Sequence, residues 1–307
     1  MIVYHELSSL CHDLGVSPKT LYTLSNQIEK HYHTVSIPKK SGGVRILHVP
    51  DPLLKSVQRS IADNLLAYMP VSAYACAYRY GMSAVQNASC HTGKDTVMRL
   101  DIRGFFDHIT FAQIREKVFS ARRFSEANSI LLTILCVYED ILPQGAPTSP
   151  MISNLILRGF DDVMGEWCRK RGIAYTRYCD DMTFSGTFDA REVKEKAAAL
   201  LRNEGFFLNG KKTLIRRQGQ RQLTTGLVVN EKVSVPAGYR RKIRQEMHCI
   251  ATFGLSSHME HAGIPEDPQD YLRSLQGRVR YVLSVSKSQE FRNYDDVISG
   301  LLKKENG

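Results

Sequence analysis

The stretch Tyr178-Cys179-Asp180-Asp181 decides the fold of this chain. The residues on either side, 174–178 and 182–185, are rich in aromatic and β-branched side chains, which predicts two short strands joined by a tight turn. Two adjacent carboxylates at such a turn repel each other, and a cation beside them relieves that repulsion. Carboxylate oxygens suit Mg²⁺, which keeps several waters and takes substrate phosphates as further ligands. The stretch therefore predicts a magnesium site that holds a nucleotide, and the competing interpretation is a solvated turn.

Two further acidic pairs, Asp161-Asp162 and Asp295-Asp296, show what an ordinary pair looks like in this chain. The first lies in an apolar pattern with helical spacing, and the second lies near the polar C-terminus. Because neither pair has predicted strands on both sides, we interpret both as surface acids.

The composition is that of a basic globular protein. The 307 residues are 43% hydrophobic, enough for a sizeable core, and 41 Lys and Arg against 31 Asp and Glu give a net charge of +10. Residues 210–244 hold ten Lys or Arg and one acid, Glu231. This clustering predicts a polyanionic partner, with a merely basic protein as the alternative.

The cysteines and the apolar runs bear on location. The seven Cys include no C-x-x-C pair and no zinc-module spacing, so we expect reduced thiols in a cytoplasmic protein. Neither a signal pattern nor an apolar run of 18 residues occurs, so we expect no membrane segment.

Several other segments carry interpretable patterns. Residues 37–47 predict a hairpin with a Gly-Gly turn and basic residues on both arms, which can fold over a triphosphate or be an ordinary exposed hairpin. Residues 96–102 predict a strand ending at Asp101, where the acid is available to a metal or serves a turn. Residues 142–150 hold three prolines and a glycine around Gln144, which predicts a rigid loop that opens a helix running to about residue 170. Further helices are expected within 1–33, over 53–69, 111–136 and 190–205, and from residue 240; further strands are expected over 206–213 and 224–230.

Three acids, Asp101, Asp180 and Asp181, are separated by a segment long enough to bring two strands together in one sheet. Two-metal phosphoryl transfer needs such a cluster of carboxylates. At this point the chain resembles the reverse transcriptases. The strand ending at Asp101, residues 144–150 and the YCDD stretch match three successive polymerase motifs, residues 39–45 match the fingers hairpin, and residues 208–213 match the next palm motif.

Within that superfamily the chain looks most like the bacterial retron reverse transcriptases. Residues 87–91, Asn-Ala-Ser-Cys-His, fit the NAxxH signature of those enzymes, and Thr224-Thr225-Gly226 stands at the place of their VTG signature. Thr224 replaces the Val of that signature, and Cys179 stands where many retron enzymes carry Ala. The short length also fits this group, and from it we expect no RNase H or endonuclease domain.

The resemblance implies an α+β, right-hand polymerase fold with fingers, an antiparallel-sheet palm and a helical thumb. It assigns residues 1–95 to N-terminal helices and fingers, 96–237 to the palm with a helical fingers insert near 111–140, and 238–307 to the thumb.

It also implies roles for single residues. Asp101 and Asp180 bridge two Mg²⁺ ions, with Asp181 as a less direct acid and the Ile102 carbonyl as a further ligand. The implied nucleotide-binding residues are Lys39 and Arg45 for the triphosphate, Phe106 against the sugar to reject a 2′-hydroxyl, Gln144, and Lys212 or its neighbour Lys211 as proton donor to pyrophosphate. For Phe106 the alternative is a core position beside Phe105. The implied RNA-binding residues are Asn87, His91, Thr225, Gly226, Arg240 and Arg241.

For function, the resemblance implies that the protein binds a cognate structured non-coding RNA, primes from the 2′-hydroxyl of an internal guanosine and uses dNTPs to make msDNA. The implied partners are an effector protein from the same locus and a host RNase H that removes the template, in anti-phage defence. The alternatives are a group II intron-like, diversity-generating or CRISPR-associated reverse transcriptase, and a non-catalytic RNA-binding scaffold. An RNA-dependent RNA polymerase is disfavoured by the bulky Phe106.

Overall fold

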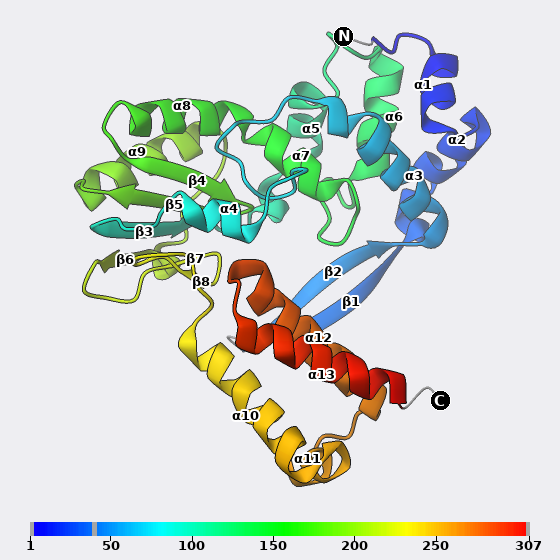
Figure 1. The fold of residues 1–307 in the computed structure, drawn as a ribbon. Helices are drawn as coiled ribbons and strands as arrows, with labels where there is room; N and C mark the ends of the chain where they lie inside the picture. Colours follow the sequence, from blue (N-terminus) through cyan, green and yellow to red (C-terminus); the bar gives the residue numbers. More distant parts are fainter. Residues whose placement is uncertain (1–2, 39–41, 305–307) are drawn as a thin grey trace. The chain divides into compact units, whose positions relative to one another are not determined.

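The computed structural model describes residues 3–38 and 42–304 (Figure 1). The chain divides into two compact units. Unit 1 comprises Met1–Ser83 and Thr96–Ile215, and unit 2 comprises Ala84–Asp95 and Arg216–Gly307.

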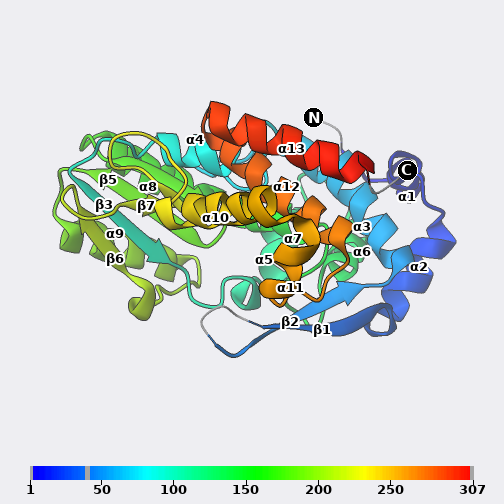
Figure 2. The same cartoon turned by 60° about the horizontal axis from the view of Figure 1, so that its bottom comes forward.

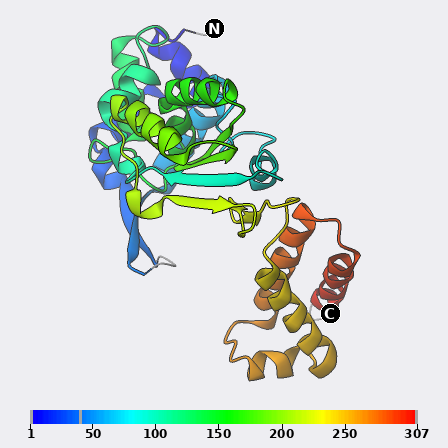
Figure 3. The same ribbon diagram turned by 90° about the vertical axis from the view of Figure 1, so that its left-hand side faces the viewer.

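The centre of unit 1 is a four-stranded sheet with the strand order β4-β5-β3-β6. Its strands are β3 (Thr96–Asp101), β4 (Ala174–Tyr178), β5 (Asp181–Gly186) and β6 (Leu214–Arg217). β5 runs antiparallel to both β3 and β4. Helices α8 (Arg158–Arg169) and α9 (Ala190–Asn203) cover one face of the sheet (Figures 1 and 3), and their apolar faces share one core with Phe184 and Tyr175. The expected antiparallel sheet is therefore present.

The rest of unit 1 is helical except for one hairpin. Its helices are α1 (Leu7–Leu14), α2 (Pro18–Asn26), α3 (Pro52–Asn64), α5 (Phe111–Lys117), α6 (Glu126–Cys136) and α7 (Ser149–Ile156), with 3-10 turns at Ile28–His31, Leu66–Tyr68, Phe106–His108 and Gly210–Lys212. Strands β1 (Tyr32–Pro38) and β2 (Val44–Pro50) pair over seven residues each and form a two-stranded ribbon (Figure 2). Helix α2 has a defined N-cap: Ser17 Oγ accepts from Thr20 N, and Pro18 is the first helical residue.

Unit 2 combines a small hairpin with a helical bundle. Its elements are α4 (Ala84–Ser89), β7 (Leu223–Thr224), β8 (Leu227–Val228), α10 (Ala237–Phe253), α11 (Leu255–His261), α12 (Pro268–Val285) and α13 (Gln289–Lys304). Apolar residues are buried at the centres of two of these helices, Ile243 and Met247 in α10 and Leu275 and Val279 in α12. Ion pairs between helices, Arg278 with Glu246 among them, supplement this packing.

Some of the expected boundaries are wrong. Residues 206–213 do not form a strand: Leu208 makes one isolated bridge to Ile102, a 3-10 turn follows, and β6 begins only at Leu214. The expected strand over 224–230 is instead a tight hairpin whose turn residues, Thr225 and Gly226, both have positive φ, as a type I′ turn requires. The helices expected over 111–136 and from 149 to 170 are each interrupted, at residues 118–125 and at Leu157.

Asp161 was expected at the surface, and that prediction is wrong. Its side chain is fully buried in an ion pair with the equally buried Arg177 of β4. The buried face of α8 runs through Asp161, Met164, Gly165 and Cys168, while Val163 is exposed. The helix is thus rotated from the expected orientation, and a cation from a distant strand compensates the buried charge.

Candidate functional site

The three acids of the predicted site lie at one end of the sheet in unit 1. Asp101 ends β3, and its partner in the antiparallel ladder is Asp181, the first residue of β5. The Ile102 amide donates to the Asp180 carbonyl oxygen at 3.0 Å, which fixes the turn against the end of β3. The predicted convergence of these residues is therefore found in the structure.

The turn that carries Asp180 is a two-residue hairpin loop. Tyr178 and Asp181 form the last pair of the β4–β5 ladder, which leaves Cys179 and Asp180 as the turn residues. Cys179 has a φ of 60°, the left-handed region that non-glycine residues rarely adopt. Positive φ at the first turn position alone is the pattern of a type II′ turn.

Two basic side chains partly neutralise the acids. Lys212 Nζ lies 2.8 Å from Asp101 Oδ2, and Arg99 lies 2.9 Å from Asp181 Oδ2. Burial raises the pKa of the Asp181 carboxyl; the Arg99 guanidinium opposes this rise, and the charges of the two other acids add to it. The hydrogen bond to Asp101 raises the pKa of Lys212, so this lysine is held in its charged form.

The donor chemistry of this cluster fits a divalent cation. Asp101 is 5% exposed, and its Oδ1 is buried without a hydrogen-bond partner, so a carboxylate oxygen remains available to an ion. Among residues 3–38 and 42–304, no three His, Cys, Asp or Glu side chains are arranged as a ready-made metal cluster. In this arrangement Lys212 and Arg99 take carboxylate oxygens that an ion would otherwise contact.

A cavity of about 470 Å³ in unit 1 gathers three predicted nucleotide-binding residues. Its lining includes Arg45 from β2, Phe106 and Gln144. It also includes Lys55 and Arg59 of α3, which the sequence analysis did not single out. Their spacing of four places them on one helix face, a signal that the sequence did contain. The cavity therefore combines three cations, two aromatic rings (Phe106 and Tyr78) and an amide. Lys39, also predicted to bind the triphosphate, lies outside the described residues.

The proline-rich loop forms one wall of this cavity and is locked to β2. The His48 amide donates to the Gln144 carbonyl oxygen at 3.0 Å, and Ser149 Oγ donates to the Pro143 carbonyl oxygen. Gly145 has a φ of 125°, and a Cβ there would lie 2.9 Å from the His48 carbonyl oxygen. The close approach that Gly145 permits is thus with the protein's own backbone.

Phe106 and Tyr78 connect the cavity to the core and to the acidic turn. Phe106 is half-buried, with its ring 5.4 Å from that of the buried Phe105, so it both packs on the core and faces the cavity. Tyr78 lines the cavity, and its hydroxyl donates to Cys179 Sγ at 3.4 Å. Burial raises the pKa of this hydroxyl, which therefore remains a donor.

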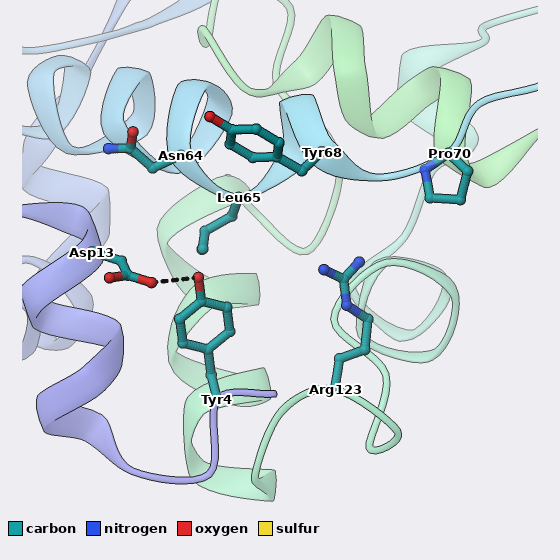
Figure 4. Close-up of a pocket in the computed structure, with 7 residues that line it drawn as sticks. All are labelled: Tyr4, Asp13, Asn64, Leu65, Tyr68, Pro70 and Arg123. Atoms are coloured by element: carbon teal, nitrogen blue, oxygen red, sulfur yellow. Dashed lines mark hydrogen bonds between the residues drawn. The ribbon is translucent and has the colours of Figure 1, made fainter. Parts of the chain in front are cut away.

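A second cavity of about 590 Å³ lies elsewhere in unit 1 (Figure 4). Tyr4, Asp13 and Arg123 are among its lining residues, and the Tyr4 hydroxyl donates to Asp13 at 2.7 Å. Burial raises the pKa of Tyr4 to about 12, with the hydrogen bond to Asp13 adding to the shift. Its lining includes none of the residues predicted for the functional site.

The two signature segments predicted to bind RNA lie together in unit 2. Asn87 on α4 and His91 just after it are completely buried, and Thr225 Oγ1 donates to the Ala84 carbonyl oxygen at the start of α4. Burial lowers the pKa of His91 to about 3, so its ring is neutral at physiological pH. Only Gly226 of this set is exposed, and an RNA-binding role for these residues stays a prediction.

The basic residues of the helical bundle fall into two groups. Arg278 and Arg280 form ion pairs with Glu246 and Asp295, so they tie helices together. Arg240 and Arg241 of α10 are half-buried and exposed, respectively, and neither has an ion-pair partner within the described part of the chain. This second pair is the more available to a phosphate backbone.

Comparisons with known proteins identify the family. Residues 37–237 match the family model of the reverse transcriptase (RNA-dependent DNA polymerase). The chain is 33% identical over 303 residues to the retron Mx65 reverse transcriptase of Myxococcus xanthus, covering 91% of this chain and 68% of that protein. It is 30% identical over 307 residues to the retron Ec86 reverse transcriptase of Escherichia coli, covering 98% of this chain and 91% of that protein.

Solved structures support the fold. The foamy viral protease-reverse transcriptase, solved with double-stranded DNA, aligns with 89% of this chain and 39% of its own at a TM-score of 0.51 and 14% identity. The expected α+β polymerase fold is thereby confirmed. None of the helices in the described residues is both long and apolar enough to cross a membrane. The motifs, the fold and the relatives agree: the chain belongs to the retron reverse transcriptases, a family of RNA-directed DNA polymerases.

Proposed function

We propose that this protein binds the structured non-coding RNA of its own retron and copies part of it into msDNA by two-metal nucleotidyl transfer. The observation that carries the catalytic part is the ladder pair Asp101–Asp181 with Asp180 on the adjoining turn. Priming from the 2′-hydroxyl of an internal guanosine, the effector partner, the host RNase H and the role in anti-phage defence rest on membership of the family.

In the proposed reaction the primer hydroxyl oxygen attacks the α-phosphorus of a dNTP. A new P–O bond forms and the hydroxyl gives its proton to solvent water, while the bond between the α-phosphorus and the oxygen that bridges it to the β-phosphorus breaks and pyrophosphate leaves. Asp101 and Asp180, with the Ile102 carbonyl, would hold two Mg²⁺ ions, which lower the pKa of the attacking hydroxyl and neutralise charge on the phosphates. Asp181, the ladder partner of Asp101 on β5, would support this cluster.

The remaining residues would bind and orient the nucleotide. Arg45, Lys55 and Arg59 give the cavity three positive charges for a triphosphate. Phe106 would contact the sugar, and Gln144 the incoming nucleotide. Lys212, whose pKa is raised by Asp101, would remain protonated and give its proton to the leaving pyrophosphate.

The test is purification of the protein from cells that carry its native locus, as wild type and as Asp180→Asn. Wild type should copurify with RNA and a branched, RNA-linked DNA, whereas the variant should carry the RNA alone. In a primer-extension assay the variant should lose at least about 100- to 1000-fold in rate, the scale of removing one electrostatic stabiliser of a transition state.

Extension that persists in Asp180→Asn would overturn the metal assignment. Linear DNA without a branch would favour the alternative types of reverse transcriptase, and RNA without DNA in the wild type would favour the scaffold.

A further inference from the structure

We infer that Arg177, held by Asp161, is a positioning residue that fixes the Cys179–Asp180 turn in the geometry needed for catalysis. The inference rests on the proposed function of the acids at that turn. It concerns residues that neither touch the cavity nor belong to the acidic cluster.

The ion pair between these residues is completely buried and geometrically specific. Arg177 Nε and Nη2 donate to both carboxylate oxygens of Asp161 at 2.6–3.0 Å, and the Tyr175 hydroxyl donates to Asp161 Oδ1 at 2.8 Å. Both side chains of the ion pair are 0% exposed. Burial lowers the pKa of Arg177, but the charge and hydrogen bonds of Asp161 outweigh that effect, so the pKa is raised and the guanidinium is charged.

The same guanidinium reaches the turn. Its remaining terminal nitrogen, Nη1, donates to the Cys179 carbonyl oxygen at 2.8 Å. A planar guanidinium can bind a carboxylate on one edge and a carbonyl on another, which a lysine ammonium cannot do with the same fixed geometry. Asp161 on α8 therefore orients a group that contacts the backbone immediately before Asp180.

The turn needs such support because its backbone is strained. Cys179 has a φ of 60°, and a non-glycine residue keeps this conformation only where surrounding contacts enforce it. The Arg177 bond to the Cys179 carbonyl and the Tyr78 bond to the Cys179 sulfur are two such contacts. They act on the backbone and on the side chain of the same residue.

The strand that carries Arg177 is itself anchored. The Arg177 amide donates to the Tyr74 carbonyl oxygen, and the Cys76 amide donates to the Arg177 carbonyl oxygen, both at 2.8 Å. The Tyr74 ring occupies the space above Gly165 of α8, where a Cβ would lie 2.1 Å from the ring. Helix α8 thus contacts β4 directly through Asp161 and contacts the Tyr74 segment beside β4 at Gly165, and Arg177 transmits that position to the turn.

The first test uses Arg177→Lys, with Tyr175→Phe as the matched control. The control removes one hydrogen bond to Asp161 but leaves the Arg177 contact with the turn. We expect Arg177→Lys to lower kcat on the order of 100-fold, the cost of a misplacement of about 1 Å, with KM for dNTP changed less than about threefold. Tyr175→Phe should stay within about threefold of wild type in both constants.

The second readout is the alkylation rate of Cys179, followed by peptide mass spectrometry without substrate or metal. Cys179 is half-buried and its sulfur accepts a hydrogen bond from the Tyr78 hydroxyl, so in the wild type it reacts slowly. Loosening of the turn in Arg177→Lys should accelerate alkylation at least about tenfold because the sulfur becomes more exposed to the reagent. The alkylation measurement tests the inference without relying on enzyme activity. A wild type without polymerase activity would refute the proposed function, but it would not affect this measurement.

A double replacement, Asp161→Leu with Arg177→Met, covers the case in which the single variants do not fold. Replacing a buried ion pair by apolar residues of similar volume is often neutral for stability, but here it removes the bond to Cys179. The inference predicts a folded protein with fast Cys179 alkylation and low kcat. Wild-type kcat and wild-type alkylation in a folded double variant would show that the pair serves stability only and would overturn the inference.

Discussion

Asp101 and Asp181 face each other as ladder partners on β3 and β5, and each carboxylate is paired with a different cation, Lys212 and Arg99. Burial raises the pKa of the Asp181 carboxyl, and the negative charges of Asp180 and Asp101 add to that rise. Stability and metal binding are therefore coupled at this end of the sheet.

Asp181→Asn should stabilise the metal-free protein at neutral pH. Because burial raises the pKa of this acid in the folded state, the folded state binds its proton more tightly than the unfolded state does. The wild type therefore loses stability as the pH rises from about 3.8, the unperturbed pKa, through the folded pKa. At pH 7 in EDTA the variant should therefore have a higher Tm than the wild type. The advantage should shrink below pH 4 and on addition of Mg²⁺, which stabilises the wild type by binding. Scanning calorimetry at several pH values checks it, and a lower Tm for the variant at pH 7 in EDTA would contradict it.

Phe106→Ala should weaken selection against ribonucleotides. Removing a ring that lines the cavity opens space for a 2′-hydroxyl, so the dNTP-to-rNTP ratio of kcat/KM should fall at least about tenfold. The buried neighbour Phe105 supplies the control, since Phe105→Leu should lower stability without changing the ratio. An unchanged dNTP-to-rNTP ratio of kcat/KM in Phe106→Ala would show that Phe106 only packs on the core.

Arg45→Ala, Lys55→Ala and Arg59→Ala should each raise KM for dNTP. Each removes one cation from the cavity lining, and loss of a charge-assisted contact typically costs about 1.5–3 kcal/mol, roughly 10- to 150-fold. Steady-state kinetics with saturating template measures the effect. The control is Arg115→Ala on α5, which removes an exposed cation paired with Glu126 and should leave KM unchanged. Equal KM values for all four variants would exclude this cavity as the triphosphate site.

Arg240→Glu with Arg241→Glu should weaken binding of the cognate RNA. Two lost phosphate contacts lower affinity by roughly 10- to 100-fold at moderate salt and make the salt dependence shallower. Lys194→Glu with Arg202→Glu on α9 makes the same change in net charge at another exposed surface and serves as the control. Equal losses of RNA affinity in both double variants would mean that binding depends only on the net charge of the protein.

His91 should make unfolding sensitive to mild acid. Its pKa is lowered to about 3 in the folded state by burial, with Lys94 contributing, whereas the unfolded value is near 6.5. Between those values the unfolded state binds one more proton, so stability falls as pH decreases. Relative to His91→Gln, the wild type should lose about 1.4 kcal/mol per pH unit between pH 6 and 4. Urea unfolding of both proteins measures this, and parallel curves of stability against pH would show that the ring is not held neutral.

The contrast between Asp180 and Asp161 shows how far the sequence could predict the site. Both belong to Asp-Asp pairs, and local pattern alone separated the turn acid from the helical one. It then placed Asp161 on the wrong side of its helix, because the residue that compensates its burial, Arg177, lies 16 positions away on a strand. Helical periodicity identifies the apolar stripe to within about one residue, which is too coarse to orient a single charged side chain.

The sequence by itself determined the order of the motifs, the acid-carrying hairpin, the basic character and the family, because residue type, turn chemistry and spacing are local properties. Only the tertiary structure decided which cations meet which acids, which residues line the cavity, and that Asn87, His91 and Asp161 are buried. Those outcomes depend on side chains from distant segments that compete for the same space and charge. No local pattern in the chain encodes the result of that competition.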